Sequence, residues 1–170
     1  LVIRLNLKNS LDSPDIQGIK PHQARMNYLR GNDPEKWVTQ IPTFREVIYR
    51  NVYPNIDLRL YTENRILRYD FIVDPGGDPT QIQLSYEGIE DLSLQEQQLV
   101  AATAFGDFAQ SEPRLYQKTS ADIIPIDGDF SLTGENSYGF CLESYNPAVP
   151  LVIDPALHFS TYLGGGNGDY

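Results

Sequence analysis

The sequence is poor in cysteine, tryptophan, methionine and histidine. It has one residue each of the first three types and two histidines among 170 residues, with 13 basic side chains against 23 acidic ones. A single cysteine excludes an internal disulfide framework and a cysteine-based metal site. The net charge of −10 comes without any basic stripe. We therefore expect neither nucleic acid nor an anionic membrane surface as a partner.

Long apolar runs and helical periodicity are also missing. No apolar segment approaches the roughly 20 residues that cross a bilayer, so we expect no membrane insertion. No window of 12 residues keeps apolar side chains at helical spacing. The hydrophobic fraction of 41% is nevertheless ordinary for a folded protein. The length suits one domain with a core of its own, with or without a short tail.

Period-two alternation runs through most of the chain. Leu1, Ile3, Leu5 and Leu7 alternate with other side chains, as in a half-buried strand. Residues 9–23 have few apolar groups and are expected to form a loop. Short strands separated by turns indicate an all-β fold, a β-sandwich or a related two-sheet antiparallel architecture. The expected strands are 1–8, 24–29, 37–41, 44–49, 56–61, 66–73, 82–86, 90–94, 98–104, 107–110, 113–117, 121–126, 129–133, 137–143 and 149–153.

Alternation also predicts which faces are buried. In the hairpin 56–73, one face should belong to the core and the other, with Arg68 and Asp70, should be wet. Asn55 suits the left-handed position of a turn after Pro54. Cys141 should be packed in or beside the core, on the face opposite Tyr138, Phe140 and Leu142. The hairpin residues expected to be buried are Leu58, Leu60, Tyr69, Phe71 and Val73.

An ordered set of motifs covers nearly the whole chain and resembles an uncharacterised bacterial domain, the one that precedes the SBBP beta-propeller repeats of large surface proteins. Asn55 stands where that family would have glycine, a change that a left-handed turn tolerates. The resemblance implies a secreted or surface-displayed β-rich module beside a propeller, and it brings no catalytic residues. The matching stretches are Met26–Trp37, Ile41–Thr43, Val52–Leu58, Tyr69–Pro79, Glu112–Gln117, Pro150–Pro155 and Ser160–Gly165.

The C-terminal stretch predicts a domain boundary. Residues 149–153 form a buried-type strand that Asp154 and Pro155 should stop, since proline lacks a donor for a central ladder. A second strand and a glycine-rich run follow. We expect residues 1–157 to form a β-rich accessory domain and residues 158–170 to begin a propeller-type repeat, with further sequence upstream of Leu1.

Acidic pairs near glycines are the first chemical candidates. Asp127 and Asp129 flank Gly128 as at the start of a calcium loop, yet later ligands are weak and the closing glutamate is missing. A glycosidase would need two carboxylates facing each other across a cleft, for which Asp74 and Asp78 are a possible pair. Aspartates that cap turns are the favoured alternative. Serine-hydrolase, phosphate-loop and histidine-metal motifs are absent, so we expect no enzyme activity and no cofactor.

Aromatic residues leave one further candidate. The chain has 11 tyrosines and one tryptophan, Trp37, which lies near Asn32, Asp33 and Lys36. Exposed aromatic faces beside such polar groups are typical of carbohydrate binding, whereas packing in a β core is the more frequent use. We expect a non-catalytic structural or interaction module, with the adjoining propeller and a protein or glycan as its partners. The alternative is a carbohydrate-binding module that uses Trp37, Asn32 and Asp33.

Overall fold

The computed structural model describes residues 2–63, 66–120 and 122–158. Within them almost every element is a strand, and every strand pair is antiparallel. The helical parts there are two short 3-10 helices, η1 (Pro34–Lys36) and η2 (Pro79–Gln81). The prediction of an all-β, two-sheet antiparallel fold is confirmed.

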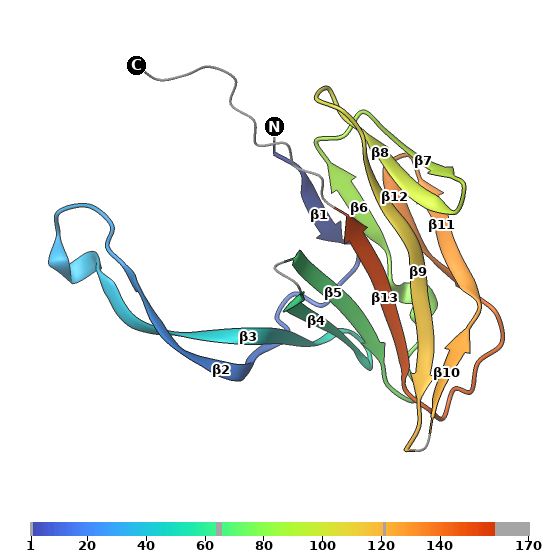
Figure 1. The fold of residues 1–170 in the computed structure, drawn as a ribbon, viewed down its shortest axis with the longest axis horizontal. Coiled ribbons are helices and arrows are strands. Elements are labelled where there is room, and N and C mark those ends of the chain that lie inside the picture. Colours follow the sequence, from blue (N-terminus) through green and yellow to red (C-terminus); the bar gives the residue numbers. More distant parts are fainter. Residues whose placement is uncertain (1, 64–65, 121, 159–170) are drawn as a thin grey trace.

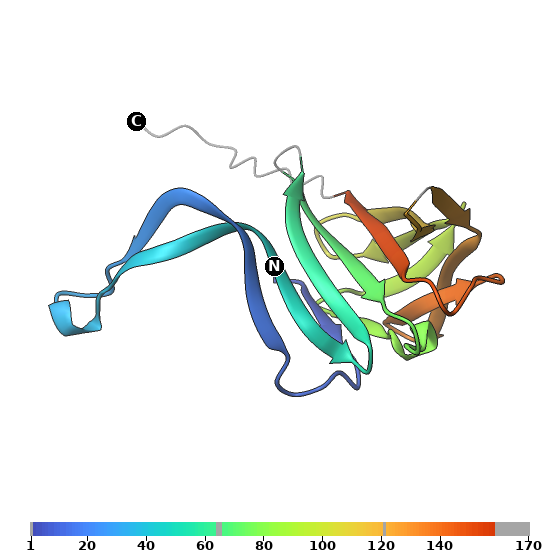
Figure 2. The ribbon, with the colours of Figure 1, turned by 90° about the horizontal axis from the view of Figure 1, so that it is seen from below.

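Two sheets make up the molecule (Figures 1 and 2). The small sheet has the order β1 (Arg4–Leu7), β6 (Leu84–Glu87), β12 (Ser137–Leu142) and β11 (Gly128–Gly134). The large sheet has the order β2 (Asp15–Tyr28), β3 (Val38–Tyr53), β4 (Ile56–Glu63), β5 (Ile66–Val73), β13 (Leu151–His158), β9 (Phe108–Lys118), β8 (Gln98–Ala102) and β7 (Asp91–Gln95), while β10 (Ile123–Ile126) pairs with β9.

The core lies between the facing sides of the two sheets. In the hairpin of β4 and β5, Phe71 is fully buried, while Leu58 and Leu60 pack against the core from its margin. The predicted inner face of this hairpin is confirmed. The opposite face is not wet throughout, because Asp70 is only 1% exposed. Other core residues are Val52, Tyr53, Ile56, Val73, Ile82, Leu84, Leu92, Leu99, Leu115, Phe130, Phe140, Leu151 and Ile153.

A polar cluster lies inside this core. Gln110 of β9 is completely buried, and its amide meets the hydroxyl groups of Tyr69, Tyr86 and Tyr138. The Tyr69 and Tyr138 hydroxyl oxygens are 3.3 Å apart. Because an unpaired buried polar group is costly, these residues depend on one another for hydrogen bonding. The cluster joins the two sheets, since Tyr86 and Tyr138 come from the small one.

The expected loop at residues 9–23 is wrong in its second part. Strand β2 begins at Asp15 and pairs with β3 along nearly its whole length. Its glycine, its proline and its polar residues are untypical of a strand, so the sequence pattern does not reveal it; pairing with β3 stabilises it instead. Gly18 has a structural role, since the Phe44 ring lies where a Cβ on this glycine would be.

Two pairs of strands that we expected to be separate are each a single strand that contains a proline. Strands predicted at 37–41 and 44–49 are one strand, β3, and Pro42 is tolerated where β3 pairs only with β2. The strands expected at 107–110 and 113–117 are likewise one, β9. Its ladder with β13 is irregular between Asp154 and Ala156, opposite Pro113. Pro113 and Pro155 therefore lie together in a bulge, where a missing N–H costs little.

Pro155 consequently does not end the last strand, and the prediction that it would is wrong. Strand β13 continues through this bulge to His158 and lies in the middle of the large sheet, between β5 and β9. The expected boundary between residues 157 and 158 falls at the end of this strand. Of the predicted following repeat at residues 158–170, His158 is the last residue of β13, and residues 159–170 lie outside the described residues.

Two smaller predictions had opposite outcomes. Asn55 has a φ of 58°, so its left-handed turn is confirmed. Cys141 is exposed rather than packed in or beside the core, because it lies on the uncovered outer face of the small sheet. Its neighbours Tyr138 and Phe140 do point inward, and Leu142 packs at the core margin as predicted.

Candidate functional site

The most unusual feature is a long hairpin formed by β2 and β3, which projects away from the sandwich (Figures 1 and 2). Pairing between β3 and β4 begins only at Glu46. We call residues 20–45 the arm and all other residues the body. Among the described residues, β2 pairs with β3 alone, so the arm is held by its own ladder.

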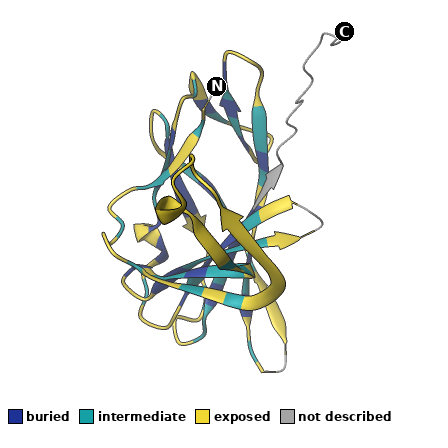
Figure 3. Ribbon diagram, turned by 90° about the vertical axis from the view of Figure 1, so that its left-hand side faces the viewer, coloured by how far each residue is buried: buried dark blue, intermediate teal, exposed yellow. Residues whose placement is uncertain are grey.

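The arm is apolar and basic. Its side chains are exposed along most of its length (Figure 3). The arm contains five arginines or lysines and two acidic residues, so its net charge is +3. Since the whole chain has a net charge of −10, the body has a net charge of −13. A group of exposed apolar residues of this kind is typical of an interaction surface. Its large exposed apolar residues are Met26, Tyr28, Leu29, Trp37, Val38 and Phe44.

The predicted ligand residues Trp37, Asn32 and Asp33 come together at the tip of this arm. The Trp37 indole donates to the carbonyl of Gly31 at 3.1 Å. The Asp33 carboxylate accepts from the Glu35 N–H at 3.1 Å and meets Lys36 Nζ at 3.2 Å. These polar groups hold the turn, and the Trp37 side chain is 39% exposed. The tip therefore presents a partly exposed aromatic side chain beside a polar turn.

Asp127 and Asp129 lie on the body, at the start of β11. Asp129 lies within this strand rather than capping a turn, and one of its carboxylate oxygens accepts from the Phe130 N–H at 2.7 Å. Both residues line a shallow hollow with Glu112 and Glu143. Throughout the described residues, no group of three or more metal-type side chains converges on one point. Asp78 does cap a turn, through bonds to Thr80.

Sequence reasoning missed a ladder of buried ion pairs on the outer face of the large sheet. Each arginine pairs with an aspartate on the next strand: Arg50 of β3 with Asp57 of β4 at 2.5 Å, and Arg59 of β4 with Asp70 of β5. Arg68 of β5 pairs with Asp154 of β13. Asp154 therefore binds a neighbouring strand and does not stop its own. The three aspartate side chains are at most 9% exposed. The sequence signal that could have revealed this ladder is the alternation of arginine and aspartate with apolar residues in these strands.

A hollow of about 550 Å³ opens beside the end of this ladder. Among the residues that line it are Tyr61 and Arg68, Asp154 of β13, and Arg114 and Tyr116 of β9. Burial, together with the nearby Asp70 and Asp154 carboxylates, raises the pKa of Tyr61 to about 12. Burial also raises the pKa of Tyr116. Both phenols thus stay protonated at neutral pH and can donate hydrogen bonds.

An apolar groove of about 390 Å³ opens where the two sheets diverge. Its floor is buried, and its open end is formed by Leu67, which is 56% exposed, and Leu5, which is 37% exposed. It lies beside β1, an edge strand of the small sheet. The groove residues are Ile3, Leu5, Leu7, Tyr49, Leu58, Leu60, Leu67, Tyr69, Phe71, Leu84 and Tyr86.

Comparison with known proteins adds one result. No curated protein and no solved structure matches this chain. In the described part of the chain, no helix has the length and hydropathy needed to cross a membrane. Residues 1–156 match the family described as a domain of unknown function, DUF7948, and the chain belongs to this family.

Proposed function

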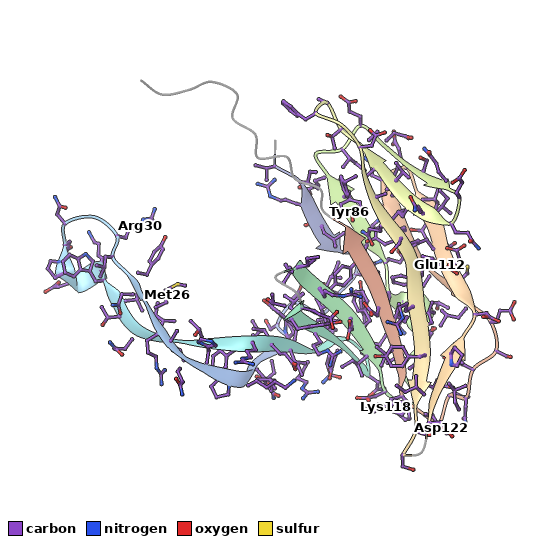
Figure 4. All side chains as sticks on the ribbon, viewed as in Figure 1. Met26, Arg30, Tyr86, Glu112, Lys118 and Asp122 are labelled. Carbon is purple, nitrogen blue, oxygen red and sulfur yellow. The ribbon has the colours of Figure 1, made fainter. Side chains whose placement is uncertain are left out.

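We propose that this domain is a non-catalytic structural and interaction module that contacts a partner through the arm. The observation that carries the proposal is the arm itself, an extended hairpin whose large apolar side chains are exposed (Figure 4). Six large side chains left in water over one hairpin are unfavourable unless another surface covers them. Met26 and Arg30, labelled in Figure 4, lie far out on it.

The arrangement of the carboxylates supports a non-catalytic role. Asp70 and Asp154 are buried on adjacent strands, where a pair of acids could act together. Each of them is bound to an arginine, Asp70 to Arg59 and Asp154 to Arg68. Both carboxylates are thus occupied by arginine partners, as in a structural ion pair. Their position across three strands suits a role in stabilising the sheet.

The setting that we propose is a larger secreted or cell-surface protein, with this domain beside a propeller. The support is the ordered set of motifs from Met26–Trp37 to Pro150–Pro155. Cover of the arm by a partner or neighbouring domain is the property that experiment can test.

Hydrogen exchange of arm amides provides the test. We expect residues 20–45 to exchange quickly in the dilute isolated chain and to be protected in the longer natural protein or its assembly. The matched reference is β8, whose protection should be equal in both samples. As a control for folding, Lys20 is joined to Arg45 through Asn-Gly, which removes the arm and should leave the sandwich intact. Rapid arm exchange in every sample would refute the proposal.

Carbohydrate binding is the second candidate function, and the hollow of the large sheet favours it more than the arm tip does. Two tyrosines, Tyr61 and Tyr116, stand beside Arg68 and Arg114 in a concave space, which offers donors for sugar hydroxyls. The test is an NMR titration with soluble oligosaccharides. Shifts confined to the hollow and lost in Tyr116→Ala would support this function; shifts centred on Trp37 would return the site to the tip.

A further inference from the structure

We propose that the partner of the arm is a second copy of this chain, with each arm lying in the apolar groove of the other copy. This inference rests on the proposed function, that the arm is a docking element. It adds the identity of the partner and the surface to which the arm binds. The two surfaces concerned are both present in one chain, and neither is covered within it.

Charge distribution is the first argument. The arm carries +3, whereas the body carries −13. A basic arm is therefore attracted by a second body, and a partner of like basic charge is disfavoured. At physiological salt this attraction acts over ~8 Å, so it is effective once the arm lies against the second body.

The chemistry of the groove is the second argument. Its lining is almost wholly aliphatic and aromatic, and its open end is formed by exposed leucines. The arm offers side chains of the same kind, among them Met26, Tyr28 and Leu29. Burying such side chains contributes about 25 cal/mol per Å² of apolar surface.

The exposed strand edges are the third argument. Strand β2 is one edge of the large sheet, and β1, which borders the groove, is one edge of the small sheet. Open edges with exposed apolar residues pair with other chains unless they are protected. Reciprocal docking of two arms closes the assembly under a two-fold axis. It also doubles the contact, toward the ~800 Å² per partner of stable complexes.

Disulfide trapping tests the geometry directly, since Cys141 is the sole cysteine and can be removed. In a Cys141→Ser background, a Met26→Cys chain is mixed with a Leu67→Cys chain under mild oxidation. We expect a disulfide-linked heterodimer that joins arm to groove. The matched control pairs Met26→Cys with Leu132→Cys, an exposed leucine on β11 that lies outside the groove. Equal cross-linking in the two mixtures would overturn the proposal.

Solution measurements provide the second test. Trp37 is the only tryptophan and reports on the arm tip, so its emission should shift to the blue as protein concentration rises. Sedimentation should show a dimer. We expect Arg25→Glu/Arg30→Glu to weaken this dimer by roughly tenfold in Kd. The body variant Arg114→Glu/Lys118→Glu changes total charge equally and should leave Kd within about twofold, because rim charges outside the contact contribute little.

The outcomes separate this inference from the proposed function. A chain that stays monomeric at millimolar concentration, with no arm-to-groove disulfide, overturns the second copy as partner. If the arm is then still protected in the longer natural protein, the proposed docking function stands with a neighbouring domain or another molecule as partner. If the arm is protected nowhere, both fail. A dimer that persists after the arm is removed would also overturn the inference.

Discussion

Arg68 of β5 and Asp154 of β13 form an ion pair across 86 positions of sequence, with one guanidinium nitrogen 2.7 and 2.9 Å from the two carboxylate oxygens. Asp154 is nearly buried, so removal of Arg68 leaves a charge without a partner. We expect Arg68→Ala to lower the free energy of unfolding by ~3 kcal/mol, measured by urea denaturation. The double variant Arg68→Leu/Asp154→Leu should lose less than the single one.

Arg4→Ala is the matched control for this prediction. Arg4 pairs with Glu87 at 3.6 Å, and both side chains are more than half exposed. We expect a loss below ~1 kcal/mol, as is usual for a surface pair. Equal losses for Arg4→Ala and Arg68→Ala would mean that burial of Asp154 does not matter.

Phe71 should be among the most costly residues to truncate. It is fully buried between the sheets, and its ring centroid lies 6.0 Å from that of Tyr69 and 6.2 Å from that of Phe140. We expect Phe71→Ala to cost ~3–5 kcal/mol in denaturant unfolding. Phe105→Ala, at a side chain that is 80% exposed, should change stability by less than ~0.5 kcal/mol. A small effect at Phe71 would contradict the position of the core.

The tyrosines should make the fold sensitive to alkali. Burial raises the pKa of Tyr61 to about 12 and that of Tyr69, Tyr86 and Tyr138 further above the ordinary value of 10.0. The unfolded chain therefore loses these protons first. Stability is complete below pH ~10 and falls as the pH rises toward the folded-state pKa values. The urea midpoint should decrease from pH ~10 upward.

Tyrosinate absorbance measures the same effect. We expect one group of tyrosines to ionise without loss of structure and another only as the chain unfolds. Tyr61→Phe removes one raised pKa and should lessen the decline between pH 10 and 12. Ionisation of all tyrosines in one step near pH 10, with the fold intact, would be inconsistent with the buried cluster around Gln110.

Calcium should have no effect on stability. Asp129 uses a carboxylate oxygen on the Phe130 N–H, and no cluster of metal-type side chains exists within the described ranges. Ligands that bind only the folded state raise its stability. We expect the melting temperature to be unchanged by millimolar calcium, in the native chain and in Asp127→Asn/Asp129→Asn. A rise that this double variant abolishes would restore the calcium site.

The burial of Tyr69, Phe71 and Val73 could be predicted from sequence, because alternation within a strand is a local property. The arm could not, since its prolines and polar residues are typical of loops and its strands are stabilised by pairing with each other. The link between Arg68 and Asp154 was hidden for a different reason. It depends on β13 lying beside β5, and strand order is not readable from periodicity. The tip residues Trp37 and Asp33 were found together because they are neighbours in sequence.

The central position of β13 has a consequence for biosynthesis. Leu151 pairs with Val73, 78 positions earlier, and also with Gln117. A ribosome releases the chain N-terminus first, so β5 and β9 are complete well before the strand that joins them exists. Until residues 151–158 leave the exit tunnel, the large sheet remains in two parts, each with an open edge. The nascent domain thus acquires its fold near the end of its own translation, and premature termination before Leu151 would release an aggregation-prone chain.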